Sequence, residues 1–275
     1  MDVKEKEEFG ALYARMEDLC LRAERGEGGA SSFLSPRELH YAARYLERRG
    51  ARFASFGGYV GAERKKLYLL PDYVELSEDL LGNPKEEAAC MEELCAFGIE
   101  AEVCALRITG SGYRTLTHRD FLGSLLGLGM ERSVLGDVVV ENEQGTSAVV
   151  FCEERMTVFV EETLVRVAND KVKLSHVELS SYVPPKRAFA PIHDTVASER
   201  LDCVVAALCG LSREKAREAV CGGLVEINFE SEERPDRTVA PPALISVRGF
   251  GRFRVLSLTD RTRKGRIRME SEQFR

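Results

Sequence analysis

ERLDCVVAALCGLSREKAREAVCGGLVEIN, residues 199–228, predicts two short helices followed directly by a strand. Apolar residues recur at the i, i+3, i+4 and i+7 positions of one helix face, at Leu201, Val204, Val205 and Leu208. We expect Ser198 to cap the start of this helix and Gly210 to end it. Ser212 is expected to cap the second helix, which a pair of glycines ends before a strand over residues 224–228.

The stretch that follows is strongly basic. Residues 248–268 hold eight Arg or Lys and a single acid, Asp260. Arg252–Val255 and Arg266–Met269 each alternate basic and apolar residues at period two, which places the arginines of a strand on one face. Together with the basic start of the second helix, this pattern predicts a phosphate-binding surface. The candidate contacts in the tail are Arg248, Arg252, Arg254, Arg261, Arg263, Lys264, Arg266 and Arg268.

The charge of the chain is divided unevenly. Residues 197–275 carry 15 basic and 12 acidic side chains, whereas residues 1–196 carry 24 and 33, within a total net charge of −6. The length of 275 residues and a hydrophobic content of 44% fit about two or three globular domains. The asymmetry predicts a C-terminal domain over residues 197–275, which is locally basic in an otherwise acidic protein.

Several classes of protein are disfavoured. The acidic start lacks the apolar segment of a secretory signal, and no apolar run approaches the roughly eighteen residues of a membrane span. The eight cysteines contain no C-x-x-C pair, so metal-ligand spacing is missing, and a chain of this length argues against a disulfide framework. We therefore expect a cytoplasmic protein with reduced thiols, no metal, no cofactor and no membrane partner.

Residues 97–180 show a β-α-β-β-α-β order. Strands are predicted over 101–109, 136–141, 147–152 and 171–179, with one helix begun by Thr117 and Asp120 and another over 157–168. This order is typical of a ferredoxin-like sandwich, a fold shared by RNA-recognition motifs. The third strand, SAVVFC, lacks their aromatic stacking pattern, so the fold alone does not decide the function.

Residues 1–96 are expected to form an N-terminal helical, α+β region. A helix is predicted over 2–25, and a second begins with the capping box of Ser35 and Glu38 and ends at Gly50. The glycine-rich stretch over residues 56–66 lacks the Gly-Lys-Ser/Thr of a phosphate loop, so a turn with a basic rim is expected there. Residues 181–196 are rich in proline and predict a linker. The fold class is therefore α+β.

The stretch 199–228 closely resembles the S4-type RNA-binding domain, or alpha-L motif. The resemblance rests on Arg200-Leu201-Asp202, on Ser212-Arg213 with Ala216, and on the run from Gly223 to Asn228. It implies that RNA is contacted by Arg200, Ser212, Arg213, Lys215, Arg217 and Asn228. Phe229 departs from the pattern, because many members have glycine there, and PPALISV replaces the usual Gly-Asp before the last strand.

The whole chain resembles the YlmH-type S4 proteins of bacteria. The supporting stretches are FLSPRELH (33–40), FGGYVGAERKKLYLLPDY (56–73), THRDFLGSLLGLGMERSVLGDVVV (117–140) and ISVRGFGRFRV (245–255). The resemblance implies binding of rRNA or tRNA on the large ribosomal subunit carrying peptidyl-tRNA, and a link to rescue of stalled translation. A secondary set of candidate RNA contacts comprises Arg64, Lys65 and Lys66 in the glycine-rich stretch and His118 and Arg119 at a helix start.

Two other classes of function are weighed against non-catalytic RNA binding. S4-type domains also deliver RNA to pseudouridine synthases and methyltransferases, but Asp202 already belongs to the S4 pattern and TGSGYRT (109–115) falls short of a cofactor loop. His118-Arg119-Asp120 matches the start of a kinase catalytic loop, yet Leu125 stands where that loop needs asparagine. The acidic N-terminal half is a candidate surface for a protein partner. We predict RNA binding without catalysis.

Overall fold

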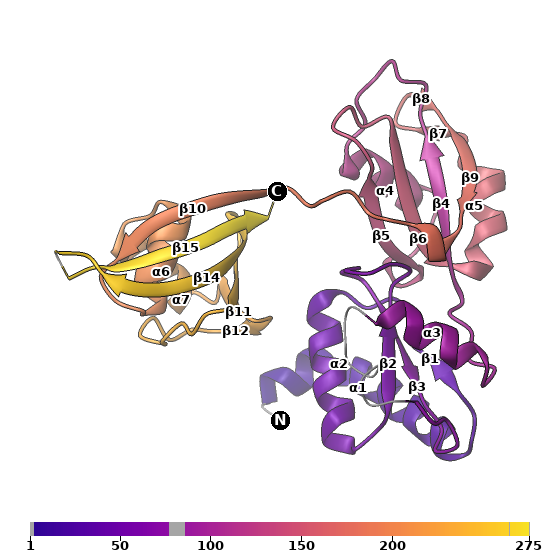
Figure 1. Cartoon of the computed structure of the whole chain (residues 1–275), viewed down its shortest axis with the longest axis horizontal. Helices are drawn as coiled ribbons and strands as arrows, with labels where there is room; N and C mark the ends of the chain where they lie inside the picture. The colour runs from indigo at the N-terminus through magenta and orange to yellow at the C-terminus, as the bar shows by residue number, and fades with distance from the viewer. Residues whose placement is uncertain (1–2, 77–85, 264, 275) are drawn as a thin grey trace. The chain divides into compact units, whose positions relative to one another are not determined.

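The computed structural model describes residues 3–76, 86–263 and 265–274, and the chain forms two compact units, Met1–Pro185 and Lys186–Arg275. Both units combine helices with antiparallel sheets, so the predicted α+β class is confirmed (Figure 1). Within the described residues, no helix is both long enough and apolar enough to cross a membrane.

The first part of unit 1 packs three helices against a small sheet with the strand order β1-β3-β2. Its elements are α1 (Val3–Glu24), β1 (Gly29–Ala30), α2 (Pro36–Arg49), β2 (Phe53–Phe56), β3 (Lys66–Leu69) and α3 (Glu87–Cys95). The capping box predicted for α2 is present, because Ser35 and Glu38 exchange hydrogen bonds between side chain and backbone. Gly50 ends the helix in the left-handed conformation that glycine favours.

The rest of unit 1 is a four-stranded antiparallel sheet with the order β5-β6-β4-β9. Its elements are β4 (Val103–Thr109), α4 (His118–Gly127), β5 (Leu135–Val140), β6 (Ser147–Glu153), α5 (Thr157–Thr163), β7 (Arg166–Val167), β8 (Asp170–Lys171) and β9 (Lys173–Val177). Single-turn 3-10 helices lie at Arg132–Val134, Glu154–Met156 and Leu179–Ser181. The helices α4 and α5 cover one face of the sheet, over a core that includes Phe121, Val150 and Val160 (Figure 1).

The helix predicted over residues 157–168 is too long. α5 ends at Thr163, and the following residues form the β7–β8 hairpin. The reason is local: Ala168 has a φ of 50°, which no α-helix accommodates, and it turns the chain with Asn169 between β7 and β8. The β-branched Val165 and Val167 before the turn favour an extended backbone.

The other face of this sheet packs against the first part of unit 1. Phe151 lies under the rings of Tyr59 and Tyr182, with Phe33 in the same buried cluster. Gly58 has a φ of 101°, and a Cβ atom there would lie 2.4 Å from the Phe151 ring. The glycine-rich stretch therefore serves a close approach between the two parts of the unit.

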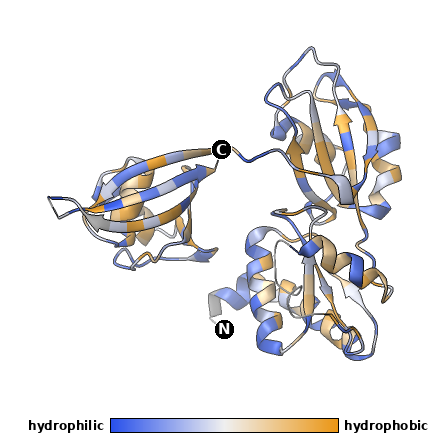
Figure 2. Cartoon of the chain, in the orientation of Figure 1, coloured by the Kyte–Doolittle hydropathy of each residue, from blue (hydrophilic) through white to orange (hydrophobic). Residues whose placement is uncertain are grey.

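Unit 2 is a six-stranded antiparallel sheet with the order β10-β15-β14-β13-β11-β12, covered on one face by two helices (Figure 1). Its elements are β10 (Phe189–Val196), α6 (Leu201–Cys209), α7 (Arg213–Cys221), β11 (Val225–Ile227), β12 (Glu230–Ser231), β13 (Ala243–Val247), β14 (Gly251–Arg261) and β15 (Ile267–Phe274). The predicted alternation along the tail is confirmed, since Phe253, Val255, Ile267 and Met269 are buried. Figure 2 shows it as bands of orange and blue along β14 and β15.

Two sequence predictions for unit 2 are wrong. Residues 189–196, assigned to a linker, form β10, which pairs along its length with β15. Pro191 is tolerated because β10 is an edge strand, where a missing N–H breaks no ladder. Ser198 does not cap α6; the backbone N–H groups of Leu201 and Asp202 instead donate to carbonyl oxygens of Arg237 and Pro235.

Candidate nucleic-acid interface

Two arginines at the starts of successive helices converge on one buried carboxylate. Asp202, in the first turn of α6, is 2% exposed. Arg200 donates to both of its oxygens at 3.1 Å, from Nε to Oδ1 and from Nη2 to Oδ2. The Nε of Arg213, the first residue of α7, donates to Oδ2 at 3.3 Å. The side chains of Arg200 and Arg213 remain 39% and 61% exposed, so their outer N–H groups face solvent.

The same contacts keep Asp202 ionised. Burial alone would raise the pKa of this carboxyl group, but the hydrogen bonds and positive charges of Arg200 and Arg213 outweigh burial and hold the pKa below its ordinary value. A carboxylate that stays charged fixes both guanidinium groups in place and costs each of them little of its donor capacity, because a guanidinium has five N–H donors.

The exposed face of α7 extends this cationic group. Ser212 caps the helix as predicted, accepting from the backbone N–H of Lys215. Lys215 and Arg217 are exposed, and within the described part of the chain no acidic side chain pairs with either. We call Arg200, Arg213, Lys215 and Arg217 the helix-start cluster.

Sequence reasoning missed two arginines close to this cluster. Arg234 and Arg237 lie in the loop whose carbonyl groups receive the first N–H groups of α6, and both pair with Glu232. They lie near the cluster because their loop, about thirty residues further along the chain, folds back onto the start of α6. The local stretch ERPDR carries as many acids as bases, so its composition gives no signal.

The arginines of β14 are engaged within the sheet. Arg254 donates to Glu272 on β15 at 3.0 Å, and its guanidinium lies 5.4 Å and 5.1 Å from the ring centroids of Phe189 and Phe274. Arg252 lies 5.4 Å from the Phe274 ring. Arginine over an aromatic face gains cation–π attraction, so these contacts stabilise the outer face of the sheet. That face therefore carries mixed charge and is not an unpaired basic wall.

The other tail residues have different surroundings. Arg266 donates to the hydroxyl and the carbonyl oxygen of Thr195, which fastens β15 to β10. Arg248, Arg263 and Arg268 are exposed, and none of them has an acidic partner among the described residues. Arg261 belongs to β14 by its backbone, and Lys264 lies outside the described residues.

Asn228 has a structural role at a turn. Its φ is 49°, its backbone N–H donates to the Leu244 carbonyl oxygen, and its Oδ1 accepts from the Leu244 N–H, each at 2.8 Å. Phe229 follows with a φ of 71°, the left-handed conformation in which glycine is comfortable. The predicted departure at Phe229 thus falls at a turn, and the Asn228 side chain is already used to hold β13.

Arg64, Lys65 and Lys66 do not form a basic rim, and we withdraw them as RNA contacts. All three are buried, with exposures of 9%, 9% and 2%. Arg64 donates to the carbonyl oxygens of Phe33, Arg132 and Leu135, Lys65 pairs with Glu87, and Lys66 pairs with Glu102. These cations hold the core of unit 1 together, since a buried charge needs a partner.

His118 and Arg119 are both exposed at the start of α4. The pKa of His118 is held below its ordinary value by partial loss of hydration and by the charge of Arg132. The predicted cap is confirmed, because Thr117 and Asp120 exchange side-chain and backbone hydrogen bonds. The helix start therefore presents His118 and Arg119 to solvent, with the charge of Arg132 close enough to act on His118.

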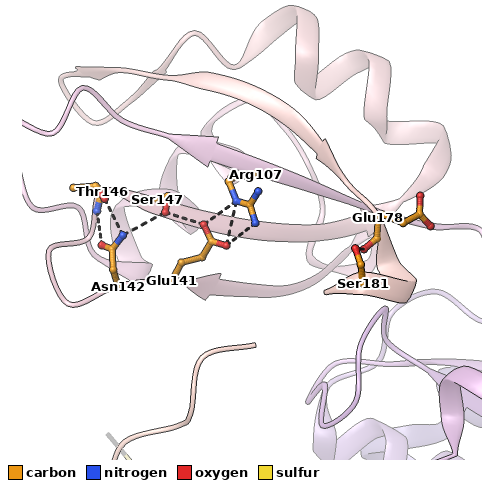
Figure 3. Close-up of polar contacts among 7 residues, drawn as sticks. All are labelled: Arg107, Glu141, Asn142, Thr146, Ser147, Glu178 and Ser181. Atoms are coloured by element: carbon orange, nitrogen blue, oxygen red, sulfur yellow. Dashed lines mark hydrogen bonds and ion pairs between the residues drawn. The ribbon is translucent and has the colours of Figure 1, made fainter. Parts of the chain in front are cut away.

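On the sheet face away from α4 and α5, the polar end is internally paired (Figure 3). Arg107 on β4 donates from Nε and Nη2 to the carboxylate of Glu141, and Ser147 donates to the same carboxylate at 2.8 Å. Asn142 closes the turn to β6 through Thr146. The charge of Arg107 is thus balanced by Glu141, which leaves this end of the sheet polar but not basic.

Comparison with known proteins relates this geometry to a family. The model described as "Putative RNA-binding domain in YlmH" matches residues 101–181. The "Ribosome-associated protein quality control protein P2" of Bacillus subtilis (strain 168) is 30% identical over 243 residues, which is 88% of this chain and 86% of that protein. The chain belongs to the YlmH family.

The chain also resembles a solved structure. The structure titled "Cell division protein ylmH from Streptococcus pneumoniae" superposes with a TM-score of 0.50 at 15% identity, covering 66% of this chain and 96% of that chain. At this identity the likeness concerns the fold alone. The YlmH domain match begins just before β4 and ends with the 3-10 helix at Leu179–Ser181, so it spans the whole four-stranded sheet and its helices.

The YlmH domain match is acidic in this chain. Residues 101–181 contain 8 basic and 12 acidic side chains. An acidic domain attracts phosphate only through a local cationic group. The start of α4 offers such a group in unit 1, while unit 2 offers the helix-start cluster.

Proposed function

We propose that this protein binds structured ribosomal RNA or tRNA without catalysing a reaction, and that unit 2 supplies the main contacts. The observation that carries the proposal is the convergence of Arg200 and Arg213 on Asp202. Guanidinium groups held in one orientation grip phosphate oxygens with little loss of side-chain entropy on binding. Lys215 and Arg217 extend the same exposed charge along α7.

The proposed domain organisation follows from the strand orders. We assign residues 97–180 to a ferredoxin-like domain, since β5-β6-β4-β9 with two helices on one face is the arrangement that a β-α-β-β-α-β order builds. We assign residues 197–275 to an S4-type domain with β10 added at the edge of its sheet, and residues 1–96 to an N-terminal region that packs on the ferredoxin-like domain within unit 1. Residues 183–188, all exposed except the half-buried Pro184, are then the connecting segment.

The setting that we propose is the large ribosomal subunit with peptidyl-tRNA, in the rescue of stalled translation in the cytoplasm. The name of the Bacillus subtilis relative supports a ribosome-associated role, and the family model supports RNA as the ligand. The acidic surface of unit 1 remains our candidate for a protein partner.

The test is co-sedimentation with purified large subunits, with and without peptidyl-tRNA, over a salt series. The variant is Arg213→Ala with Arg217→Ala, and the matched control is Arg15→Ala with Arg25→Ala, two exposed residues on α1 and directly after it. Each lost phosphate contact should lower the log–log salt slope by about 0.7 to 0.9. Binding should weaken by about tenfold or more in the helix-start variant.

Two results would contradict the proposal. Equal affinity and equal salt slope for the variant and the control would remove the helix-start cluster from the interface. Absence of co-sedimentation at low salt, for the unmodified protein, would remove the large subunit as the partner. The RNA-modifying alternative would then be tested by mass analysis of ribosomal RNA and tRNA after incubation with the protein.

A further inference from the structure

Two cysteines face each other on the central strands of the unit 1 sheet. Cys104 on β4 and Cys152 on β6 are directly opposite in the antiparallel register, and their sulfur atoms lie 3.8 Å apart. Among the described residues, no other two cysteine sulfurs are within hydrogen-bonding distance of each other. The pair is therefore unlike the six other cysteines, which have no thiol neighbour at such a distance.

The two thiols differ in access. Cys152 is fully buried, whereas Cys104 is only partly buried at the edge of the helix-covered core. The hydroxyl of Thr157, the first residue of α5, donates to the sulfur of Cys104 at 2.8 Å. Cys104 is therefore the more accessible of the two thiols, and the sulfur of Cys152 lies 3.8 Å from it.

The surroundings of Cys104 favour its thiolate. Its pKa is lowered, first by the hydrogen bond with the Cys152 thiol and then by the Thr157 hydroxyl and the nearby His176, against burial and the charge of Glu154. The pKa of Cys152 is raised by the same hydrogen bond and by its burial. Cys104 is thus the attacking sulfur and Cys152 the resolving one.

We propose that Cys104 and Cys152 form a dithiol site that reacts with peroxide and closes to a reversible disulfide between β4 and β6. The Cys104 thiolate attacks one oxygen of hydrogen peroxide, which gives the sulfenic acid and releases hydroxide, so sulfur is oxidised and peroxide is reduced. The Cys152 thiol then attacks the Cys104 sulfur, the S–S bond forms, and the sulfenic oxygen leaves as water. A dithiol reductant reverses the closure by thiol–disulfide exchange.

The backbone already has the spacing that closure requires. Directly opposed residues of an antiparallel ladder have Cα atoms about 4.5 to 5.5 Å apart, and disulfides accept roughly 4.4 to 6.8 Å. Closing the gap between the sulfurs needs side-chain rotation and no change of register. Disulfide formation also changes the Cys104 sulfur that accepts from the Thr157 hydroxyl. The start of α5 is therefore the part of the fold whose hydrogen bonding changes on oxidation.

The experiment treats the full-length protein with hydrogen peroxide, blocks remaining thiols, and maps the cysteines by mass spectrometry. Cleavage after Glu102 and Arg107 separates Cys104 from Cys90 and Cys95, so the pairing can be read directly. We expect loss of two of the eight thiols and a linked peptide pair containing Cys104 and Cys152. A dithiol reductant should restore both thiols.

Variants separate the two steps. Cys152→Ser should stop at a Cys104 sulfenic acid that dimedone traps, and Cys104→Ser should slow loss of the Cys152 thiol by about tenfold or more. Cys221→Ser, which changes an exposed cysteine in unit 2, is the control and should react as the unmodified protein does. Thermal unfolding of the reduced variants reports whether each one folds.

Three outcomes would overturn the proposal. These are oxidation of Cys95 or Cys221 while Cys104 and Cys152 stay reduced, accumulation of Cys104 sulfinic acid with Cys152 still a free thiol, and linkage of Cys104 to any other cysteine. Mapping of the unmodified protein decides among them even when a variant fails to fold.

Discussion

Arg200 and Arg213, at the starts of α6 and α7, are held together by hydrogen bonds of 3.1 Å and 3.3 Å to the carboxylate of Asp202. The contact joins two helices whose connection is only the short turn at Gly210–Ser212, and it sets the direction in which α7 presents its basic face. The buried carboxylate of Asp202 therefore orients the exposed guanidinium groups of Arg200 and Arg213.

Removal of the Asp202 charge should destabilise unit 2. Asp202→Asn keeps the shape but leaves two guanidinium groups with a weak neutral acceptor, so the free energy of unfolding should fall by about 1 to 3 kcal/mol. Urea denaturation followed by circular dichroism measures the change. Asp236→Asn alters an exposed carboxylate whose charge acts on Arg200, and it should change stability by about 0.5 kcal/mol or less.

The same carboxylate should give unit 2 a specific dependence on acid. Because the pKa of Asp202 is lower in the folded than in the unfolded state, its contribution is complete above the unfolded pKa of about 3.9 and is lost as pH falls through the folded value. The stability difference between the unmodified protein and Asp202→Asn should therefore shrink between about pH 5 and about pH 2. A difference that stays constant over this interval would show that the carboxylate is not paired.

Helix capping separates two serines that look alike in the sequence. Ser212→Ala should cost about 1 kcal/mol, because the Lys215 N–H at the start of α7 loses its acceptor. Ser198→Ala should cost much less, because carbonyl groups of residues 235 and 237 receive the first N–H groups of α6. Thermal unfolding of the two variants side by side measures both, and equal losses would contradict the assigned caps.

The cases of Ser198 and Pro191 show where local reasoning stops. Period and capping residues predicted α2 and α7 with their boundaries and α4 with its start, since those signals act within a few residues. The start of α6 is instead capped by a loop more than thirty residues away, and β10 is a strand only because β15 lies beside it. Neither partner can be read from the segment itself.

The candidate interface divides in the same way. Arg213, Lys215 and Arg217 could be predicted from a capped basic helix, but the role of Asp202 depends on the packing of two helices. The run Arg64-Lys65-Lys66 gives no sign in the sequence that its lysines are buried. Their partners Glu87 and Glu102 lie more than twenty residues further along the chain. Charge composition alone cannot tell a solvated cation from one that bonds within the core.

Arg64 should act on stability and not on RNA binding. Its guanidinium donates to carbonyl oxygens of Phe33, Arg132 and Leu135, so Arg64→Ala leaves these acceptors without a donor and should cost about 3 kcal/mol of unit 1 stability. Arg64→Lys should recover little of this loss, because one ammonium cannot reproduce the planar fork. Arg119→Ala, at an exposed site, is the control and should leave stability nearly unchanged.

Urea denaturation gives the stabilities, and the salt dependence of RNA binding at a temperature where Arg64→Ala is folded gives the second readout. A lower salt slope for Arg64→Ala would mean that this arginine reaches phosphate after all, which its burial rules out in the fold described here.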